Sequence, residues 1–410
     1  MNKKKIINDP VYGFITIPFD LVHDIIEHPW FQRLSRIRQL GLTYLVYPGA
    51  LHTRFHHTIG ALHLMSGAIE TLRSKGHAIS EEEARGACVA ILMHDIGHGP
   101  FSHALENLLA KDISHEYLSD LIMRRLNKEF NNELDVAISI FNNEHPKKFL
   151  HQLVSSQLDV DRLDYLNRDS FFTGVSEGVI SSDRIIKMLD VAEGNLVVEE
   201  KGIYSVEKFI TARRLMYWQV YLHKTVLAAE HMLIHIIKRA RELALNGNDL
   251  FGTPAFLNFL KQEHSVDEFE SNDLILSAFA QLDDFDVFTS VKAWMDHTDP
   301  VLSKLCTGLV NRKLYRIELS KVPFDEHEIK LRKAETAAKL GIPTSEAHYF
   351  CFTDSIQNNA YNAADDKINI LFKNGTITDI AVASDNFNIG ALAKPVTRYF
   401  FCNYRWDQQS

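Results

Sequence analysis

Apolar residues recur at spacings of three and four along most of the first 320 positions, and this periodicity predicts a mainly α fold. One helix start is marked by a capping box, because Ser80 is followed by Glu83 at the third position after it. Long helical segments are expected at residues 19–40, 58–74, 80–96, 115–129 and 207–245.

Two short segments show strand patterns instead. Residues 6–18 contain β-branched positions on both sides of a turn that runs from Asp9 to Gly13, which predicts an extended pair. Residues 195–206, NLVVEEKGIYSV, predict a β-hairpin that turns at Lys201 and Gly202. The helical part is therefore expected to carry small β-hairpins.

The pattern changes after about residue 320. A charged helix is expected at residues 326–340, and Asn374-Gly375 between apolar runs is a strong hairpin signal. Strands are expected at residues 348–353, 368–372 and 398–403. We predict a helical core over residues 1–320 and an appended C-terminal α+β subdomain over residues 321–410.

Composition narrows the class of protein. The 410-residue chain is 46% hydrophobic and 24% charged, values typical of a globular protein. A net charge of -9 disfavours general nucleic-acid binding. The four cysteines include no CxxC pair, so neither a disulfide framework nor a structural zinc site is expected. The longest apolar run, residues 87–93, is too short to cross a membrane, and we expect a cytoplasmic protein.

Titratable side chains gather where one apolar helix ends, in ILMHDIGHGPFSH at residues 91–103. His94 and His98 are four apart and would share a helix face beside Asp95, and the glycines would let the chain bring His103 back. Any one of these histidines is more often an ordinary buried residue, but the combination favours a metal site. Imidazole and carboxylate suit Mn, Fe, Mg or Zn with open water positions, and such an ion favours hydrolysis.

Two further ligands are needed, and the residues alone leave the choice open. LHTRFHHTIG at residues 51–60 offers three histidines, and SQLDVDRLDYLNRD at residues 156–169 offers several aspartates. Taken in order, HTRFHHTIG, MHDIGHGPFSH and LDVDRLDY resemble the motifs of the HD-domain phosphohydrolase superfamily, as do FQRLSRIRQLG, YPGA and the His-Lys pair at 223–224. The resemblance covers residues 5–225 and is greatest to the branch of deoxynucleoside triphosphate (dNTP) triphosphohydrolases.

The resemblance implies a divalent cofactor, Mn, Mg or Fe, with Zn or Ni as substitutes in a crystal. It makes His57, His94, Asp95 and Asp161 the metal ligands, with His57 chosen over His56 because the family ligand comes three residues after the arginine. Asp159 and Asp164 are then expected to form salt bridges or caps.

Catalytic and substrate residues follow from the same resemblance. His98, His103 and His115 match phosphate-facing histidines, and Glu106 matches the acid that orients His103 as a general acid. The triphosphate clamp would comprise Arg54, Arg162, Arg213 and Lys224. Gln39 and Asp169 would bind the 3′-hydroxyl of the sugar, and Tyr165 would lie along its ring. Leu40 and Tyr221 would lie near the 2′ position, although core packing is an equal alternative for these two residues.

A regulatory nucleotide site is suggested by Lys5, Asn8 and Gln32, which match positions around an activator pocket in the family. Glu27 and Ser35 replace the residues that read guanine there, which disfavours guanine-specific activation.

The expected function is therefore metal-dependent hydrolysis of a dNTP to deoxynucleoside and tripolyphosphate, by a homo-oligomer between dimer and hexamer. The alternatives are an HD phosphohydrolase of ribonucleotides, nucleoside monophosphates or cyclic phosphodiesters, and a nucleotide sensor without turnover.

Overall fold

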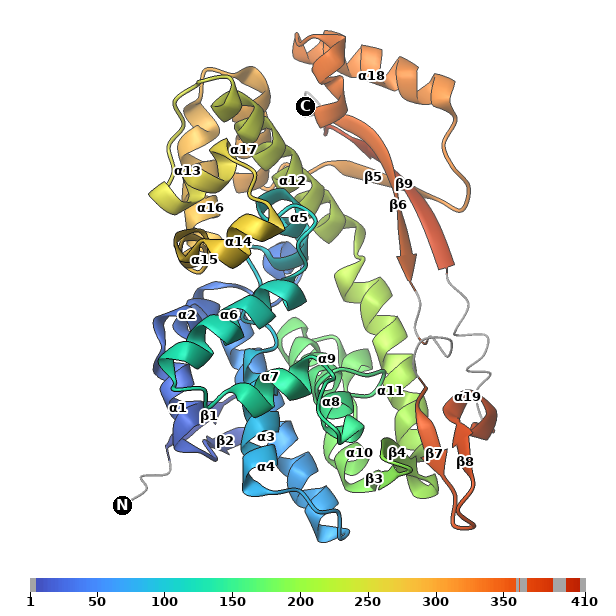
Figure 1. Cartoon of the computed structure of the whole chain (residues 1–410). Coiled ribbons are helices and arrows are strands. Elements are labelled where there is room, and N and C mark those ends of the chain that lie inside the picture. The colour runs from blue at the N-terminus through green and yellow to red at the C-terminus, as the bar shows by residue number, and fades with distance from the viewer. Residues whose placement is uncertain (1–4, 359–360, 362–366, 386–395, 406–410) are drawn as a thin grey trace.

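The computed structural model describes residues 5–358, 361, 367–385 and 396–405, and it is mainly helical, as the periodicity predicts (Figure 1). The helices up to residue 245 are α1 (Asp20–Glu27), α2 (Pro29–Gln32), α3 (Arg54–Ser74), α4 (Glu81–Met93), α5 (Glu106–Leu109), α6 (His115–Glu129), α7 (Asp135–Phe141), α8 (Lys148–Val154), α9 (Val160–Thr173), α10 (Ser182–Met188), α11 (Ile203–Met216) and α12 (Lys224–Leu245). The later helices are α13 (Pro254–Lys261), α14 (Val266–Ser271), α15 (Asp273–Phe279), α16 (Asp284–Ala293), α17 (Pro300–Val310), α18 (Glu326–Leu340) and α19 (Ile380–Ala383).

The strands form small sheets at the edges of the helical body. They are β1 (Ile6–Asp9), β2 (Gly13–Thr16), β3 (Leu189–Ala192), β4 (Asn195–Glu199), β5 (Arg316–Ser320), β6 (Cys351–Asn358), β7 (Asn369–Leu371), β8 (Ile377–Asp379) and β9 (Val396–Asn403). β1 pairs with β2, and the two larger sheets have the orders β3-β4-β7-β8 and β5-β9-β6. The predicted extended pair at residues 6–18 is thus confirmed.

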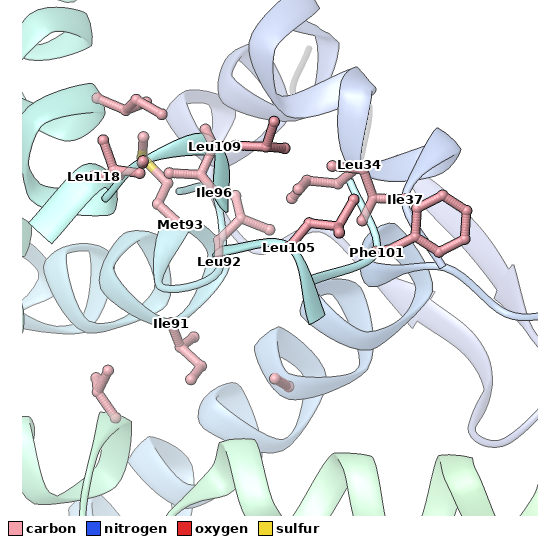
Figure 2. Packing of buried hydrophobic residues seen from close by; sticks show 14 of the residues in the cluster. Leu34, Ile37, Ile91, Leu92, Met93, Ile96, Phe101, Leu105, Leu109 and Leu118 are labelled. Carbon is pink, nitrogen blue, oxygen red and sulfur yellow. The ribbon is translucent and has the colours of Figure 1, made fainter. Parts of the chain in front are cut away.

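The core that positions the site is built on α3 and α4, which pack against each other while α9 packs on α3. α4 begins with the predicted capping box: Ser80 Oγ accepts from Glu83 N at 3.1 Å, and Glu83 Oε2 accepts from Ser80 N at 2.8 Å. Its C-terminal turn is wholly apolar. Figure 2 shows the side chains packed there, which include Ile91, Leu92, Met93, Ile96, Leu105, Leu109 and Leu118. Each such side chain contributes about 1.5–3 kcal/mol on burial, which fixes the end of α4 in place.

The single helix expected at residues 19–40 is wrong. The segment is divided into α1, α2 and the 3₁₀ turn η1 (Arg33–Arg36), because His28 is extended at φ -66° and ψ 135°. A residue before proline avoids the helical region, and Pro29 follows. His28 instead caps α2 by accepting from Trp30 N at Nδ1, 3.2 Å away.

The hairpin expected at residues 195–206 is also wrong, since β4 pairs with the preceding strand β3. Its turn is at Glu193 and Gly194, whose φ angles of 52° and 78° suit a tight hairpin. Gly202 lies against the core instead, where an added Cβ would come within 2.5 Å of Val198 Cγ1. The residues after Gly202 therefore begin α11.

The C-terminal residues complete sheets that the earlier part of the chain begins. β7 pairs with β4 in parallel, and β9 pairs with β5, while α18 has the predicted bounds. The Asn374-Gly375 hairpin between β7 and β8 is confirmed. The division at residue 320 stays a prediction, with strand pairing across it. α12 runs between the α13–α17 helices and the β5-β9-β6 sheet (Figure 1). No helix of the described ranges is long and apolar enough to cross a membrane.

Candidate metal centre and nucleotide site

The predicted metal ligands come from three helices and lie together. His57 belongs to α3, His94 and Asp95 follow α4, and Asp161 belongs to α9. His57 Nε2 is 3.0 Å from Asp161 Oδ1, and His94 Nε2 is 3.4 Å from the same oxygen. Asp95 closes the group, with Oδ1 3.3 Å from His94 Nε2 and Oδ2 3.7 Å from His57 Nε2. Atoms bound to one ion at about 2.1 Å are themselves about 3 Å apart, so these separations fit a shared metal.

Both imidazoles use Nδ1 for a hydrogen bond and direct Nε2 toward the cup, where each Nε2 could offer its electron pair to a metal ion. His57 Nδ1 donates to Asp164 Oδ2 at 2.7 Å, and His94 Nδ1 donates to the carbonyl of Ile91 at 2.6 Å. Each Nε2 is buried and makes no hydrogen bond of good geometry with the described residues. This is the arrangement by which second-sphere groups orient metal-binding histidines, and the residues present therefore fit a divalent cation.

The cup formed by His57, His94, Asp95 and Asp161 carries excess negative charge. Burial opposes a charge on His57, yet the carboxylates of Asp161 and Asp164 raise the pKa of this imidazole to about 10. A site that stabilises a proton so strongly also stabilises a metal cation. His57 is fully buried, whereas the Asp161 side chain is 25% exposed, so the cup opens on the Asp161 side.

The turn after α4 differs from the expected geometry. α4 ends at Met93, so His94 and His98 do not share a helix face. They instead approach Asp95 Oδ1 from two sides, at 3.3 and 3.4 Å. Gly97 allows this because a Cβ there would lie 2.2 Å from the carbonyl oxygen of His115. α6 thus packs directly on the turn.

The phosphate-side histidines are partly brought together. The rings of His98 and His115 stack with centroids 3.8 Å apart. Burial and the nearby Arg54 lower the pKa of His98 well below its usual value, which keeps this ring neutral. Glu106 Oε1 accepts from His115 Nδ1 at 2.9 Å and from its backbone N at 2.6 Å. The side chain of His103 lies outside the described residues, so its pairing with Glu106 stays a prediction.

A strained turn leads into His103. Phe101 and Ser102 have φ angles of 52° and 50°, in the left-handed region that side chains other than glycine rarely adopt. Asp284 on α16 stabilises the turn by accepting from Phe101 N at 2.7 Å. Ser102 Oγ accepts from Arg54 Nε at 2.9 Å, and Arg54 also pairs with Asp95. Arg54 therefore lies at the cup, as predicted. Nothing in the sequence identifies Asp284, which is distant along the chain.

The predicted sugar residues lie beside the cup. Tyr165 on α9 has its ring centroid 6.5 Å from that of His57 and 6.3 Å from that of Tyr221. The Tyr221 hydroxyl donates to Asp169 Oδ2 at 2.7 Å, so this residue does more than form an apolar wall. The other oxygen, Oδ1, accepts from His52 Nε2 at 2.8 Å. Sequence reasoning missed His52, because it is one of three histidines in the same short segment.

Gln39 and Leu40 precede the 3₁₀ turn η2 (Gly41–Leu45). Gln39 N donates to the carbonyl of His52 at 3.0 Å, while the Gln39 side-chain oxygen is buried and has no hydrogen-bond partner among the described residues. Leu40 is half-buried against the apolar core, which agrees with packing and leaves a sugar contact untested.

The predicted cations differ in their surroundings. Arg162 pairs with Asp159, which also caps α9, so Asp159 has the structural role expected of it. Arg213 is buried and its Nη1 donates to Gln157 Oε1 at 3.1 Å. Burial raises the pKa of Tyr165, and both arginines lie close enough to this side chain to oppose that shift. Lys224 is exposed at the first residue of α12.

The three regulatory positions make separate contacts. Lys5 contacts His23, Asn8 lies on β1 opposite Phe14, and Gln32 Nε2 donates to the carbonyl of Ile26 at 2.7 Å. No hydrogen bond joins them to one another within the described chain, so a nucleotide site there stays a prediction.

Fold and site together define an HD-domain protein, and comparison with known proteins agrees. The HD domain family matches residues 54–169, and the HD associated region matches residues 180–250. The chain belongs to the HD-domain phosphohydrolases, in the branch related to the dNTP triphosphohydrolases.

Two of the similar proteins match nearly the whole chain, and a third matches about three fifths of it. A crystal structure of a phosphohydrolase from Bacteroides thetaiotaomicron is 56% identical, has a TM-score of 0.95, and is matched over 98% of this chain and 100% of that one. Uncharacterized protein YwfO of Bacillus subtilis is 32% identical over 93% of this chain and 88% of its own length. The deoxynucleoside triphosphate triphosphohydrolase SAMHD1 homolog of Dictyostelium discoideum is 31% identical over 62% of this chain, which spans 53% of that relative.

Proposed function

We propose that this protein is a metal-dependent dNTP triphosphohydrolase that releases a deoxynucleoside and tripolyphosphate. The observation that carries the proposal is the position of Asp169, Tyr221 and Tyr165 beside the cup of His57, His94, Asp95 and Asp161. Polar side chains that could bind a sugar therefore lie next to a centre suited to phosphate hydrolysis. Relatives named as dNTP triphosphohydrolases support the same substrate class.

The cup would hold Mn, Mg or Fe, and such an ion lowers the pKa of bound water and polarises a phosphoryl oxygen. Arg54 contacts Asp95 and would bind the phosphate next to the sugar. Arg162, Arg213 and Lys224 would bind the outer phosphates. Glu106 orients the ring of His115 by accepting from its Nδ1, and His98 stacks on that ring, so both imidazoles would line the phosphate side of the cup. His103 would protonate the leaving 5′-oxygen.

Tyr165 would stack along the sugar, and Gln39 and Asp169 would bind its 3′-hydroxyl. Leu40 and Tyr221 would lie near the 2′ carbon. Because an added hydroxyl is rejected strongly only where it leaves a polar group unpaired, this wall gives a moderate preference for deoxyribose.

Product analysis tests the proposal. Purified protein loaded with Mn²⁺ or Mg²⁺ is incubated with each of the common dNTPs, and products are separated by chromatography. We expect deoxynucleoside and tripolyphosphate in equal amounts, and none from a variant with His94→Ala and Asp95→Ala. If metal-loaded wild-type protein releases no deoxynucleoside from any dNTP, the proposal is wrong.

A second candidate is hydrolysis of a ribonucleotide, nucleoside monophosphate or cyclic phosphodiester by the same centre. The observation that favours it is the Tyr221 hydroxyl, a polar group in the wall assigned to the 2′ position. Orthophosphate or a linear dinucleotide among the products would support this candidate, and binding without any product would support a nucleotide sensor. Light scattering tests the homo-oligomer, expected between dimer and hexamer.

A further inference from the structure

His52 is buried between two residues of the proposed sugar pocket. Its side chain is completely inaccessible to solvent, and its ring stacks on Phe172 with centroids 4.4 Å apart and planes 17° apart. Nε2 donates to Asp169 Oδ1 at 2.8 Å, and the backbone carbonyl accepts from Gln39 N at 3.0 Å. One residue therefore holds both Gln39 and Asp169, through its backbone and its side chain respectively.

The contacts of His52 determine which nitrogen carries the proton. Nδ1 is buried and has no hydrogen-bond partner among the described residues. A proton on Nδ1 would be buried without an acceptor, whereas a proton on Nε2 is bound by the Asp169 carboxylate. His52 therefore donates through Nε2 toward Asp169, and stacking on Phe172 prevents the ring from turning away.

Asp169 is fully buried yet keeps unused hydrogen-bonding capacity. His52 donates to Oδ1 and Tyr221 donates to Oδ2, and within the described part of the chain this leaves about half of the lone-pair sites of a carboxylate without a side-chain donor. Two donors, one on each oxygen, fix the plane of this carboxylate. A carboxylate held in this way is a strong acceptor for a hydroxyl group of the bound sugar.

We propose that His52 is a positioning residue that orients Asp169 toward the 3′-hydroxyl of the nucleotide, and so sets the preference for substrates that carry this hydroxyl. The inference rests on the proposed function. It predicts that the effect of changing His52 depends on the substrate, since a nucleotide without a 3′-hydroxyl makes no use of Asp169.

The test compares two variants and two substrates. His52→Phe keeps a flat ring against Phe172 but removes the donor, whereas His52→Gln keeps a donor near the position of Nε2. The substrates are the dNTP that the wild type hydrolyses fastest and its 2′,3′-dideoxy counterpart. In each preparation the ratio of kcat/KM for the two substrates is measured, and partial misfolding cancels from this ratio.

We expect the wild type to prefer the dNTP by about 10–100-fold, the typical effect of losing a hydrogen bond to a charged group. His52→Phe should lower the ratio to near one by slowing dNTP hydrolysis, and His52→Gln should restore much of it. His56→Phe is the matched control, because His56 contacts Thr53 and not Asp169, and it should leave the ratio unchanged. If a variant turned over neither nucleotide, the ratio of their dissociation constants in EDTA gives the same test.

Failure of the inference and failure of the proposed function give different results. If the wild type discriminates but His52→Phe keeps the full ratio, or if the wild type does not discriminate at all, the role of His52 is wrong and the dNTPase function stands. If the wild type hydrolyses no dNTP, the proposed function itself is wrong.

Discussion

Two pairs of histidines in this protein have opposite electrostatic surroundings. His57 and His94 face Asp161 in the cup, and despite burial the carboxylates raise the pKa of His57 to about 10. His231 and His235 on α12 face aromatic rings, and burial lowers the pKa of His235 to about 3. The imidazoles of His57 and His235 are both buried, so their neighbours, and not burial itself, determine which charge each site stabilises.

The comparison also shows what helical spacing indicates. His231 and His235 are four residues apart on one continuous helix, whereas His94 and His98 lie on a turn after α4. Spacing alone would therefore favour the α12 pair as metal ligands. Yet the groups of described residues that could hold a metal include His57, His94 and Asp161, and neither histidine of α12. Convergence of carboxylates, more than spacing, distinguishes the two.

The largest expected effect is on metal binding, which should depend on the cup and not on the histidines of α12. Asp161→Ala removes the carboxylate that both Nε2 atoms approach, so bound metal should fall to a trace and hydrolysis should fall by about 10³-fold or more. Plasma mass spectrometry and the product assay measure both quantities. His235→Phe is the control and should keep its full metal content. A full complement of metal in Asp161→Ala would contradict the assignment of the cup.

A weaker effect on metal binding is expected from Asp164, which contacts the predicted ligand His57. Asp164→Asn weakens the bond that orients His57 Nδ1 and leaves the buried Arg168 with Asp9 as its one full carboxylate partner among the described residues. Loss of such a partner typically lowers metal affinity by about 10–100-fold. Competition with a chelator measures the affinity. An unchanged affinity would mean that the Asp164 carboxylate serves Arg168 and not the metal.

Those residues also show what could be read from the sequence. The HD motif and the two motifs on either side of it give His57, His94, Asp95 and Asp161. These residues do lie together, although metal binding itself stays a prediction. Local signals likewise give the Ser80 capping box, the β7-β8 hairpin and the bounds of α18. In each of these elements, the residues that determine the geometry are close along the chain.

Contacts between distant segments that lie outside these motifs could not be predicted. Asp284 supports the Phe101 turn from α16, and His52 reaches Asp169 from the segment that precedes α3. No spacing rule links either pair. Lys201-Gly202 is an equally good local turn, whereas in the structure the hairpin turns at Glu193-Gly194 and Gly202 packs close to Val198. Tertiary contacts decide between local alternatives that the sequence makes equivalent.

The α12 pair should make the protein sensitive to acid. His235 accepts protons in the unfolded chain below pH 6.5, but in the folded protein only near pH 3. The unfolded state therefore binds more protons between these values, and stability falls as pH falls through 6.5. We expect a loss of about 2 kcal/mol of unfolding free energy by pH 5, from 1.36 kcal/mol per pH unit.

Urea unfolding at pH 7.5 and 5.0 measures this loss. His235→Phe should be close to wild type at pH 7.5, because a ring still packs against Phe352 and Tyr349 while the Tyr315 hydroxyl still donates to the carbonyl of Tyr349. At pH 5.0 the variant should be the more stable protein. An equal loss in both proteins would show that other groups cause the acid sensitivity.

The smallest effect concerns His231, and it tests whether the degree of burial sets the size of the acid response. Its ring lies 5.4 Å from Phe352 and 5.2 Å from Phe400, burial lowers its pKa, and Asp354 opposes that shift while Lys238 adds to it. Because His231 is half-buried and has this carboxylate nearby, His231→Phe should change the loss between pH 7.5 and 5.0 by less than about 1 kcal/mol. The double variant with His235→Phe should show the sum of the two effects if each ring titrates independently. A His231→Phe effect as large as that of His235→Phe would mean that the aromatic cluster opens as a unit in acid. The acid response would then be a property of the whole cluster and not of the surroundings of each ring.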